Sequence, residues 1–167
     1  MRNYRIKCEI DRVNIFFALA LGGVFLLIDF AVWCAVGSPA YMLRFVSGRV
    51  SVLPLWVFGL LDFLAFTLFG AALGCALSAK GGCGVDRYRG AFYFIIGVTL
   101  FYLHHIFFFV YGAFLMSFLV AALIFSLLVI AIVNFSRVSS VSSLCAVLGG
   151  VWSVYILIFS GLVFFRA

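Results

Sequence analysis

Long apolar runs separated by short polar segments are the dominant pattern along this chain. Continuous hydrophobic stretches lie at about residues 13–36, 54–78, 91–111, 114–135 and 144–165. A helix needs about 20 mostly apolar residues to cross the hydrocarbon of a bilayer, whereas barrel strands alternate apolar and polar positions. Each run is therefore predicted to be one transmembrane helix. A basic leader precedes the first run, as in a signal peptide, but the length of the run favours a retained helix.

Polar and glycine-rich segments mark the predicted connections. They are GSPAYMLRFVSGRVSV after the first run, AKGGCGVDRYRG after the second, a tight turn at Gly112, and SRVSSVS before the last run. The KGGCG segment lacks the G-K-[ST] of a phosphate-binding loop, so we interpret it as a flexible connection. With no internal repeat or polar domain, residues 1–167 are predicted to form a single membrane domain.

Composition supports this interpretation. Of the 167 residues, 68% are hydrophobic and 10% are charged, whereas a soluble domain is about half apolar and about a quarter charged. The predicted fold class is all-α, an integral membrane bundle of five helices whose main partner is the lipid bilayer. Nucleic acid is not an expected partner, because the basic residues form no patch interleaved with stacking aromatic side chains.

The basic residues predict an orientation in the membrane. With the N-terminus inside, the inner segments hold eight Lys and Arg residues and the outer segments hold three. The inner residues are Arg2, Arg5, Lys7, Arg12, Lys80, Arg87, Arg89 and Arg137, and the outer ones are Arg44, Arg49 and Arg166. This asymmetry follows the positive-inside rule, so the N-terminus is expected inside and the C-terminus outside.

The cysteines suggest no metal or redox motif. They stand at positions 8, 34, 75, 83 and 145 and form no C-x-x-C pair, which argues against zinc-finger and thioredoxin-like chemistry. We interpret them as small hydrophobic side chains and loop thiols.

Four ionisable side chains interrupt the apolar runs: Asp29, Asp62, His104 and His105. Such residues are costly at bilayer depth and usually face a bundle interior or a wet cavity. Asp29 and Asp62 stand at similar predicted depth on consecutive helices, so we expect them near each other. The adjacent histidines are about 100° apart on their helix. The histidines are candidates for a proton relay, a cofactor ligand or a ligand contact, and equally for hydrogen bonds between helices.

Residues 53–78 carry a recognisable pattern. Pro54 is followed by WVFG at 56–59, by Phe66, and by Gly70 with small residues after it. This resembles the second helix of the TspO/MBR family, the tryptophan-rich sensory proteins related to the mitochondrial translocator protein, with its P-P-x-W-V-F-G and V-W-x-x-L-Y motifs. FFF at 107–109 and Trp152 lie at the spacing of the family's Phe-Phe pair and P-Y-L-x-W tryptophan. The resemblance spans roughly residues 53–78 and 94–161.

The resemblance implies a pocket between the helices, under the first loop, for a porphyrin, haem or a similar hydrophobic molecule. The matched pocket positions are Asp62, Phe66, Phe101, His104, Trp152, Ile156 and Ser160. No cofactor is required and no enzymatic activity is expected, but His104 is a candidate ligand for haem iron. Asp62 and Phe66 share a helix face, as do Trp152 and Ile156. That spacing suits a pocket wall and a plain core stripe alike.

The chain departs from the family at several of these positions. Asp62 replaces a tryptophan, Phe66 a tyrosine, and His104 a tryptophan. Tryptophan-dependent porphyrin photochemistry is therefore not expected. Tyr155 and Arg166 are too far apart for the proposed sterol motif, which favours a bacterial cytoplasmic membrane.

Three functions follow as alternatives. The first is a receptor or carrier for a hydrophobic molecule. The second is a small proton-coupled transporter or channel-like protein that uses Asp29, Asp62 and His104. The third is a structural membrane subunit, in which Gly70 and Gly74 form a small-residue packing seam. The seam fits a homodimer and intramolecular packing equally.

Overall fold

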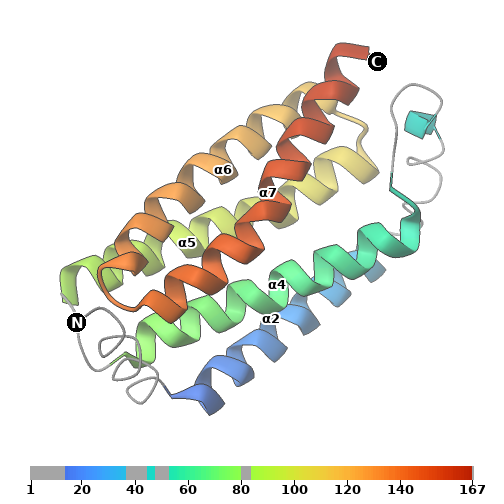
Figure 1. Ribbon diagram of the computed structural model, residues 1–167. Helices are drawn as coiled ribbons and strands as arrows, with labels where there is room; N and C mark the ends of the chain where they lie inside the picture. Colours follow the sequence, from blue (N-terminus) through green and yellow to red (C-terminus); the bar gives the residue numbers. More distant parts are fainter. Residues whose placement is uncertain (1–13, 37–44, 48–52, 80–83, 167) are drawn as a thin grey trace.

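The computed structural model describes residues 14–36, 45–47, 53–79 and 84–166. The N-terminal leader, most of the predicted first loop and residues 80–83 lie outside the described part. The helices are α2 (Ile15–Val36), α4 (Leu55–Ser78), α5 (Gly84–His105), the π-helical turn η1 (Ile106–Val110), α6 (Phe114–Ser136) and α7 (Ser140–Arg166). Apart from a helical turn at 45–47, they form one elongated bundle (Figure 1). The all-α prediction is confirmed.

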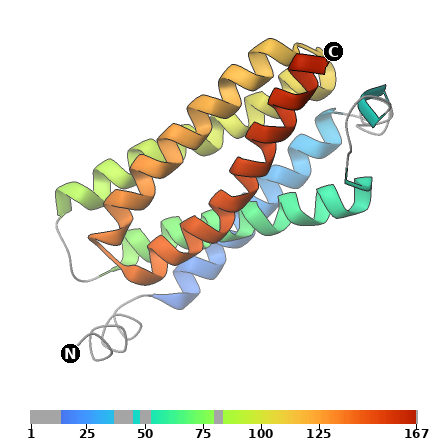
Figure 2. The same cartoon turned by 45° about the horizontal axis from the view of Figure 1, so that its top comes forward.

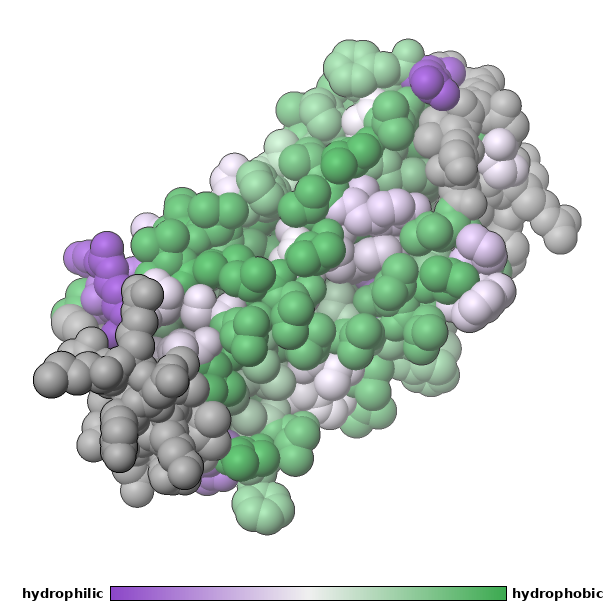
Figure 3. Space-filling model, in the orientation of Figure 1, coloured by the Kyte–Doolittle hydropathy of each residue, from purple (hydrophilic) through white to green (hydrophobic). Residues whose placement is uncertain are grey.

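Each helix is long enough to cross a bilayer. Among the described residues, five helical segments have the length and apolar composition of a membrane span, with α5 and η1 counted as one segment from Gly84 to Val110. The shortest of them, α2, has 22 residues, about 33 Å at 1.5 Å per residue, against about 30 Å of hydrocarbon. On the face of the bundle shown in Figure 3, hydrophobic residues cover most of the middle, and the most hydrophilic residues in view lie near the two ends. The chain is an integral membrane protein.

Two helices begin earlier than the apolar pattern predicted. Helix α5 begins at Gly84 instead of near residue 91, with Asp86 in its first turn, where a carboxylate interacts favourably with the helix dipole. Helix α7 begins at Ser140 instead of near residue 144, because the Ser139 hydroxyl accepts a hydrogen bond from the amide of Ser142 (3.3 Å). Hydropathy alone assigns such polar first turns to loops, because it does not register charge or hydrogen bonding at the start of a helix.

The predicted turn at Gly112 is confirmed. Gly112 has φ 60°, a left-handed conformation that glycine adopts without steric cost. Just before it, η1 ends with the Tyr111 amide bonded to the Ile106 carbonyl at 3.2 Å. This wide final turn lets the chain reverse into α6.

The helices are arranged as two layers joined by α7. Helix α2 packs along α4, α5 packs along α6, and α7 contacts both α4 and α6 (Figures 1 and 2). Smaller contacts join α5 to α4, and α2 to α5 and η1. The end of α2, the start of α4 and the end of α5 thus meet near one end of the bundle.

The small-residue seam serves packing within the chain. A Cβ added at Gly70 would collide with the backbone of Leu21, and one at Gly74 would lie 2.5 Å from the Cα of Ala18. The GxxxG spacing therefore lets α2 and α4 approach closely, as such motifs do in membranes. Of the two uses predicted for the seam, the structure shows the intramolecular one.

Candidate functional site

The seven residues predicted to line a pocket meet in the core. They are Asp62 and Phe66 on α4, Phe101 and His104 on α5, and Trp152, Ile156 and Ser160 on α7. Their exposed fractions run only from 0% to 6%. The helix faces that carry them come together, and all seven side chains are buried there. Only Trp152 among the seven lines the hollow described below.

Asp62 is the centre of a buried polar cluster. Its Oδ1 accepts a hydrogen bond from the indole Nε1 of Trp152 at 2.6 Å, and its Oδ2 accepts one from the indole Nε1 of Trp33 at 2.8 Å. The Nε2 of His105 lies 2.9 Å from the same Oδ2. Hydrogen bonds to charged groups contribute about 1.5–3 kcal/mol each. Three other helices thus supply the partners that hold a carboxyl group at this depth.

The orientation of His105 fixes its tautomer. Its Nδ1 lies 2.9 Å from the backbone carbonyl oxygen of Phe101. A carbonyl only accepts, so Nδ1 carries the hydrogen. In a neutral ring Nε2 is then a lone pair facing the Asp62 oxygen. A close contact between these two atoms requires a proton or a metal ion between them.

The structure corrects the sequence-based choice of histidine. The sequence groups His104 with Asp29 and Asp62, but His105 is the histidine that contacts Asp62. The Nε2 of His104 contacts the Ser160 hydroxyl at 2.9 Å, and its ring stacks on Phe108. Both histidines are buried. Their side chains leave the helix about 100° apart, so His105 faces α4 and His104 faces α7.

Asp29 completes the cluster from α2. The predicted proximity of the two aspartates is confirmed: Asp29, Asp62 and His105 each offer one ligand atom within 4.8 Å of the others. Asp29 is 0% exposed, and neither of its carboxylate oxygens has a hydrogen-bond partner among the described residues. Buried polar groups are nearly always satisfied, so this carboxyl group calls for a partner that the described protein atoms do not supply.

Sequence reasoning missed Trp33 and under-rated His105. Trp33 stands four residues after Asp29, which puts the two side chains on one helix face. This spacing is a usable signal, since an indole N–H one turn from a buried carboxylate is a natural donor to the same cluster. No comparable signal separates His105 from His104.

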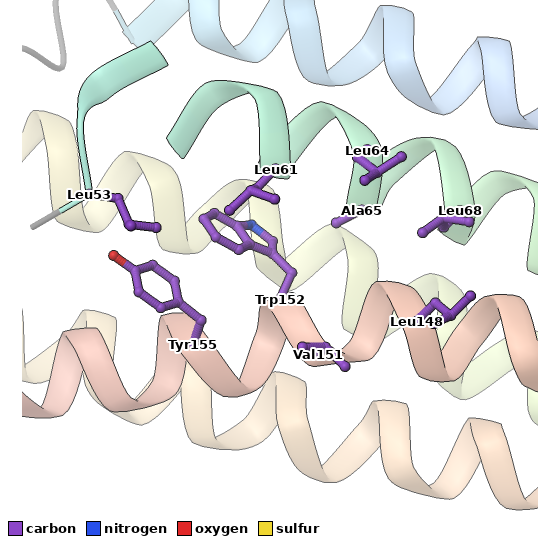
Figure 4. A pocket seen from close by; sticks show the side chains of 9 residues that line it. All are labelled: Leu53, Leu61, Leu64, Ala65, Leu68, Leu148, Val151, Trp152 and Tyr155. Carbon is purple, nitrogen blue, oxygen red and sulfur yellow. The ribbon is translucent and has the colours of Figure 1, made fainter. Parts of the chain in front are cut away.

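A hollow lies beside the cluster, between α4 and α7. Its volume is about 210 Å³, below the roughly 300–1,000 Å³ of typical small-molecule pockets. The lining is Leu53, Leu61, Leu64, Ala65, Leu68, Leu148, Val151, Trp152 and Tyr155 (Figure 4). The rings of Trp152 and Tyr155 stack at 4.8 Å and supply the aromatic part of this wall.

Comparisons of the chain with family models, with curated proteins and with solved structures found no match. What the site can do is therefore argued from its own geometry.

Proposed function

We propose that this membrane protein is a receptor or carrier for a small hydrophobic molecule, which enters between α4 and α7 from the side of the bundle. The single observation that carries this proposal is the apolar hollow walled by Trp152, whose indole is anchored on Asp62 at 2.6 Å. We also propose that the chain is a divergent member of the TspO/MBR family, on the motifs in residues 53–78 and 94–161.

The anchored indole supports binding because it is pre-oriented. The hydrogen bond to Asp62 and the stack on Tyr155 hold the ring of Trp152 in one position. A ligand then need not order that side chain, which lowers the cost of association. The polar edge of the indole is turned to Asp62, and apolar surface is left for the ligand.

The size of the hollow limits the ligand class. An aromatic or branched apolar group fits a volume of about 210 Å³. A porphyrin or haem would place one edge there and leave the rest between the helices and lipid. For His104 to bind haem iron, its Nε2 atom would have to break its hydrogen bond with the Ser160 hydroxyl. We expect the binding end of the bundle on the outer side of a bacterial cytoplasmic membrane.

The test compares two tryptophans of α4 and α7, Trp56 and Trp152. Purified protein in detergent is screened by thermal shift against porphyrins, haem and smaller apolar aromatic molecules, since a ligand that binds the folded state raises the Tm. Trp152→Phe should abolish or strongly reduce the shift. Trp56→Phe is the matched control, because Trp56 is 73% exposed on α4. A shift of equal size in wild type and Trp152→Phe would place binding elsewhere, and no shift at all would favour a structural subunit.

A second candidate is a proton-coupled transporter, favoured by the buried cluster of Asp29, Asp62 and His105, with His105 in the role expected of His104. Beyond the cluster, toward Ser78, the core continues with Phe69 and Phe94, both 0% exposed. These rings offer no polar continuation of a proton path, so ligand binding is the better supported function. If vesicles that contain the protein show a proton flux that is lost on substitution of Asp29, the proton-coupled transporter becomes the better supported function.

A further inference from the structure

We propose that Asp29, Asp62 and His105 form a binding site for one divalent transition-metal ion, such as Zn²⁺ or Mn²⁺. Three helices contribute one ligand atom each, and these atoms lie within 4.8 Å of one another. Ligands at about 2.0–2.2 Å from a zinc ion lie no more than about 4.4 Å apart. A small movement of the three side chains toward one another is enough to enclose an ion. This metal site does not depend on the proposed ligand hollow.

The carboxyl group of Asp29 is the observation that points to a ligand. Both of its oxygens are buried and lack a hydrogen-bond partner among the described residues. By contrast, each oxygen of the nearby Asp62 accepts a hydrogen bond from an indole N–H. The packing thus provides donors for one carboxylate and, among the described residues, none for its neighbour. A cation between the two would supply the partner that Asp29 lacks.

His105 is oriented as a metal-binding histidine is. Metal-ligating imidazoles usually donate their second ring N–H to a carbonyl or carboxylate, which fixes the tautomer and aims the lone pair at the ion. Here Nδ1 donates to the Phe101 carbonyl and Nε2 faces the cluster. The indoles of Trp33 and Trp152 hold Asp62 in a corresponding way. The outer partners that make a metal site rigid are therefore in place.

The charges balance for a divalent ion. Two carboxylates and a neutral imidazole carry a charge of −2, which a divalent cation neutralises in a medium where unpaired charges are costly. Other titratable groups near the cluster are His104, whose ring lies 6.0 Å from that of His105, and Tyr102, whose ring stacks on Phe66. Neither is a fixed cation. The described arginines stand near helix ends: Arg87, Arg89, Arg137 and Arg166. None is placed to neutralise the two aspartates.

The ligand set selects the kind of ion. Imidazole suits zinc, iron, copper and nickel, whereas sites for magnesium and calcium are built from oxygen alone. One nitrogen and two carboxylates suit Zn²⁺ or Mn²⁺. Three protein ligands leave at least one coordination position open, which water or a small anion can fill.

The experiment titrates metal into the full-length chain, purified in detergent and stripped with a chelator. Co²⁺ is added as a spectroscopic probe, and Zn²⁺ affinity is measured by competition with a chromophoric chelator. We expect one Zn²⁺ per chain, no gain from added Mg²⁺, and a change in tryptophan emission, since two indoles donate to Asp62. Asp29→Asn and His105→Gln should each weaken binding at least a hundredfold, the upper end of what loss of an outer-shell partner costs.

Matched variants separate this site from adventitious binding. Asp86→Asn removes a carboxylate at the other end of α5, and His104→Gln removes the neighbouring imidazole, and both should keep wild-type affinity. Thiolate-to-cobalt charge-transfer bands would assign the binding to cysteines and overturn the proposal. Unchanged affinity in both Asp29→Asn and His105→Gln would also overturn the proposal. So would the absence of stoichiometric metal binding in wild type, since the cluster would then hold only protons. Asp29→Asn keeps the side-chain volume, and its fold is checked by circular dichroism and Tm.

Discussion

The indole Nε1 of Trp152 donates a hydrogen bond of 2.6 Å to Oδ1 of Asp62, across the contact between α4 and α7. The two residues are 90 positions apart in the chain. One wall of the apolar hollow is thereby tied to the buried polar cluster. A substitution in the polar cluster should therefore alter the wall of the hollow, and a ligand bound in the hollow should alter the cluster.

Replacing Asp62 by Asn should destabilise the protein. The amide keeps one acceptor oxygen, but its NH₂ group must face an indole N–H or the His105 contact, so at least one buried donor loses its acceptor. The expected cost is about 1–3 kcal/mol, seen as a lower Tm in detergent. Asp86→Asn is the control, because the ion pair of Asp86 with the exposed Arg137 spans 3.7 Å and pairs of this kind contribute little. Equal Tm values for the two variants would contradict a central role for Asp62.

The two histidines should differ in their effect on stability. His105→Leu removes the group that faces Asp62 and leaves a buried carboxylate short of a partner, which typically costs about 3–5 kcal/mol. His104→Leu removes a single contact to Ser160, at a cost of about 1 kcal/mol. Thermal melting of both variants in the same detergent shows which substitution lowers the Tm more. A larger loss for His104→Leu would show that the pairing is the reverse of the one described.

Gly74 and Gly59 provide a matched test of the α2–α4 contact. Gly74→Ala places a methyl group 2.5 Å from the Cα of Ala18, and such overpacking costs about 1–3 kcal/mol. Gly59→Ala meets nothing within 4 Å, so it should be neutral or gain up to about 1 kcal/mol from helix propensity. Both are measured by thermal melting. Destabilisation by Gly59→Ala alone would argue against the close approach of these helices.

Reporter fusions should place Ala79 and Arg166 on opposite sides of the membrane. Ala79 follows α4, and Arg166 ends α7 at the other end of the bundle (Figure 1). The excess of basic residues near the Ala79 end predicts that this end is inside. A cytoplasmic reporter active after Ala79 and inactive after Arg166 is the expected result. The same side for both fusions would contradict five spans.

Local sequence features predict the five spans, the turn at Gly112 and the similar depth of Asp29 and Asp62. Each of these depends on local properties: the length of an apolar run, the φ preference of glycine, and the count of residues from a helix end. The starts of α5 at Gly84 and of α7 at Ser140 are not predicted in this way, because a polar first turn resembles a loop when only hydropathy is considered.

Which side chains meet depends on how the helices pack against one another. Helical periodicity gives the directions of His104 and His105 around their own axis, but only the rotation and placement of that helix decide which neighbour each direction faces. Packing sets that rotation, through contacts such as Gly90 and Gly97 of α5 against Phe135 and Leu128 of α6, and this is why Asp62 meets His105 rather than His104.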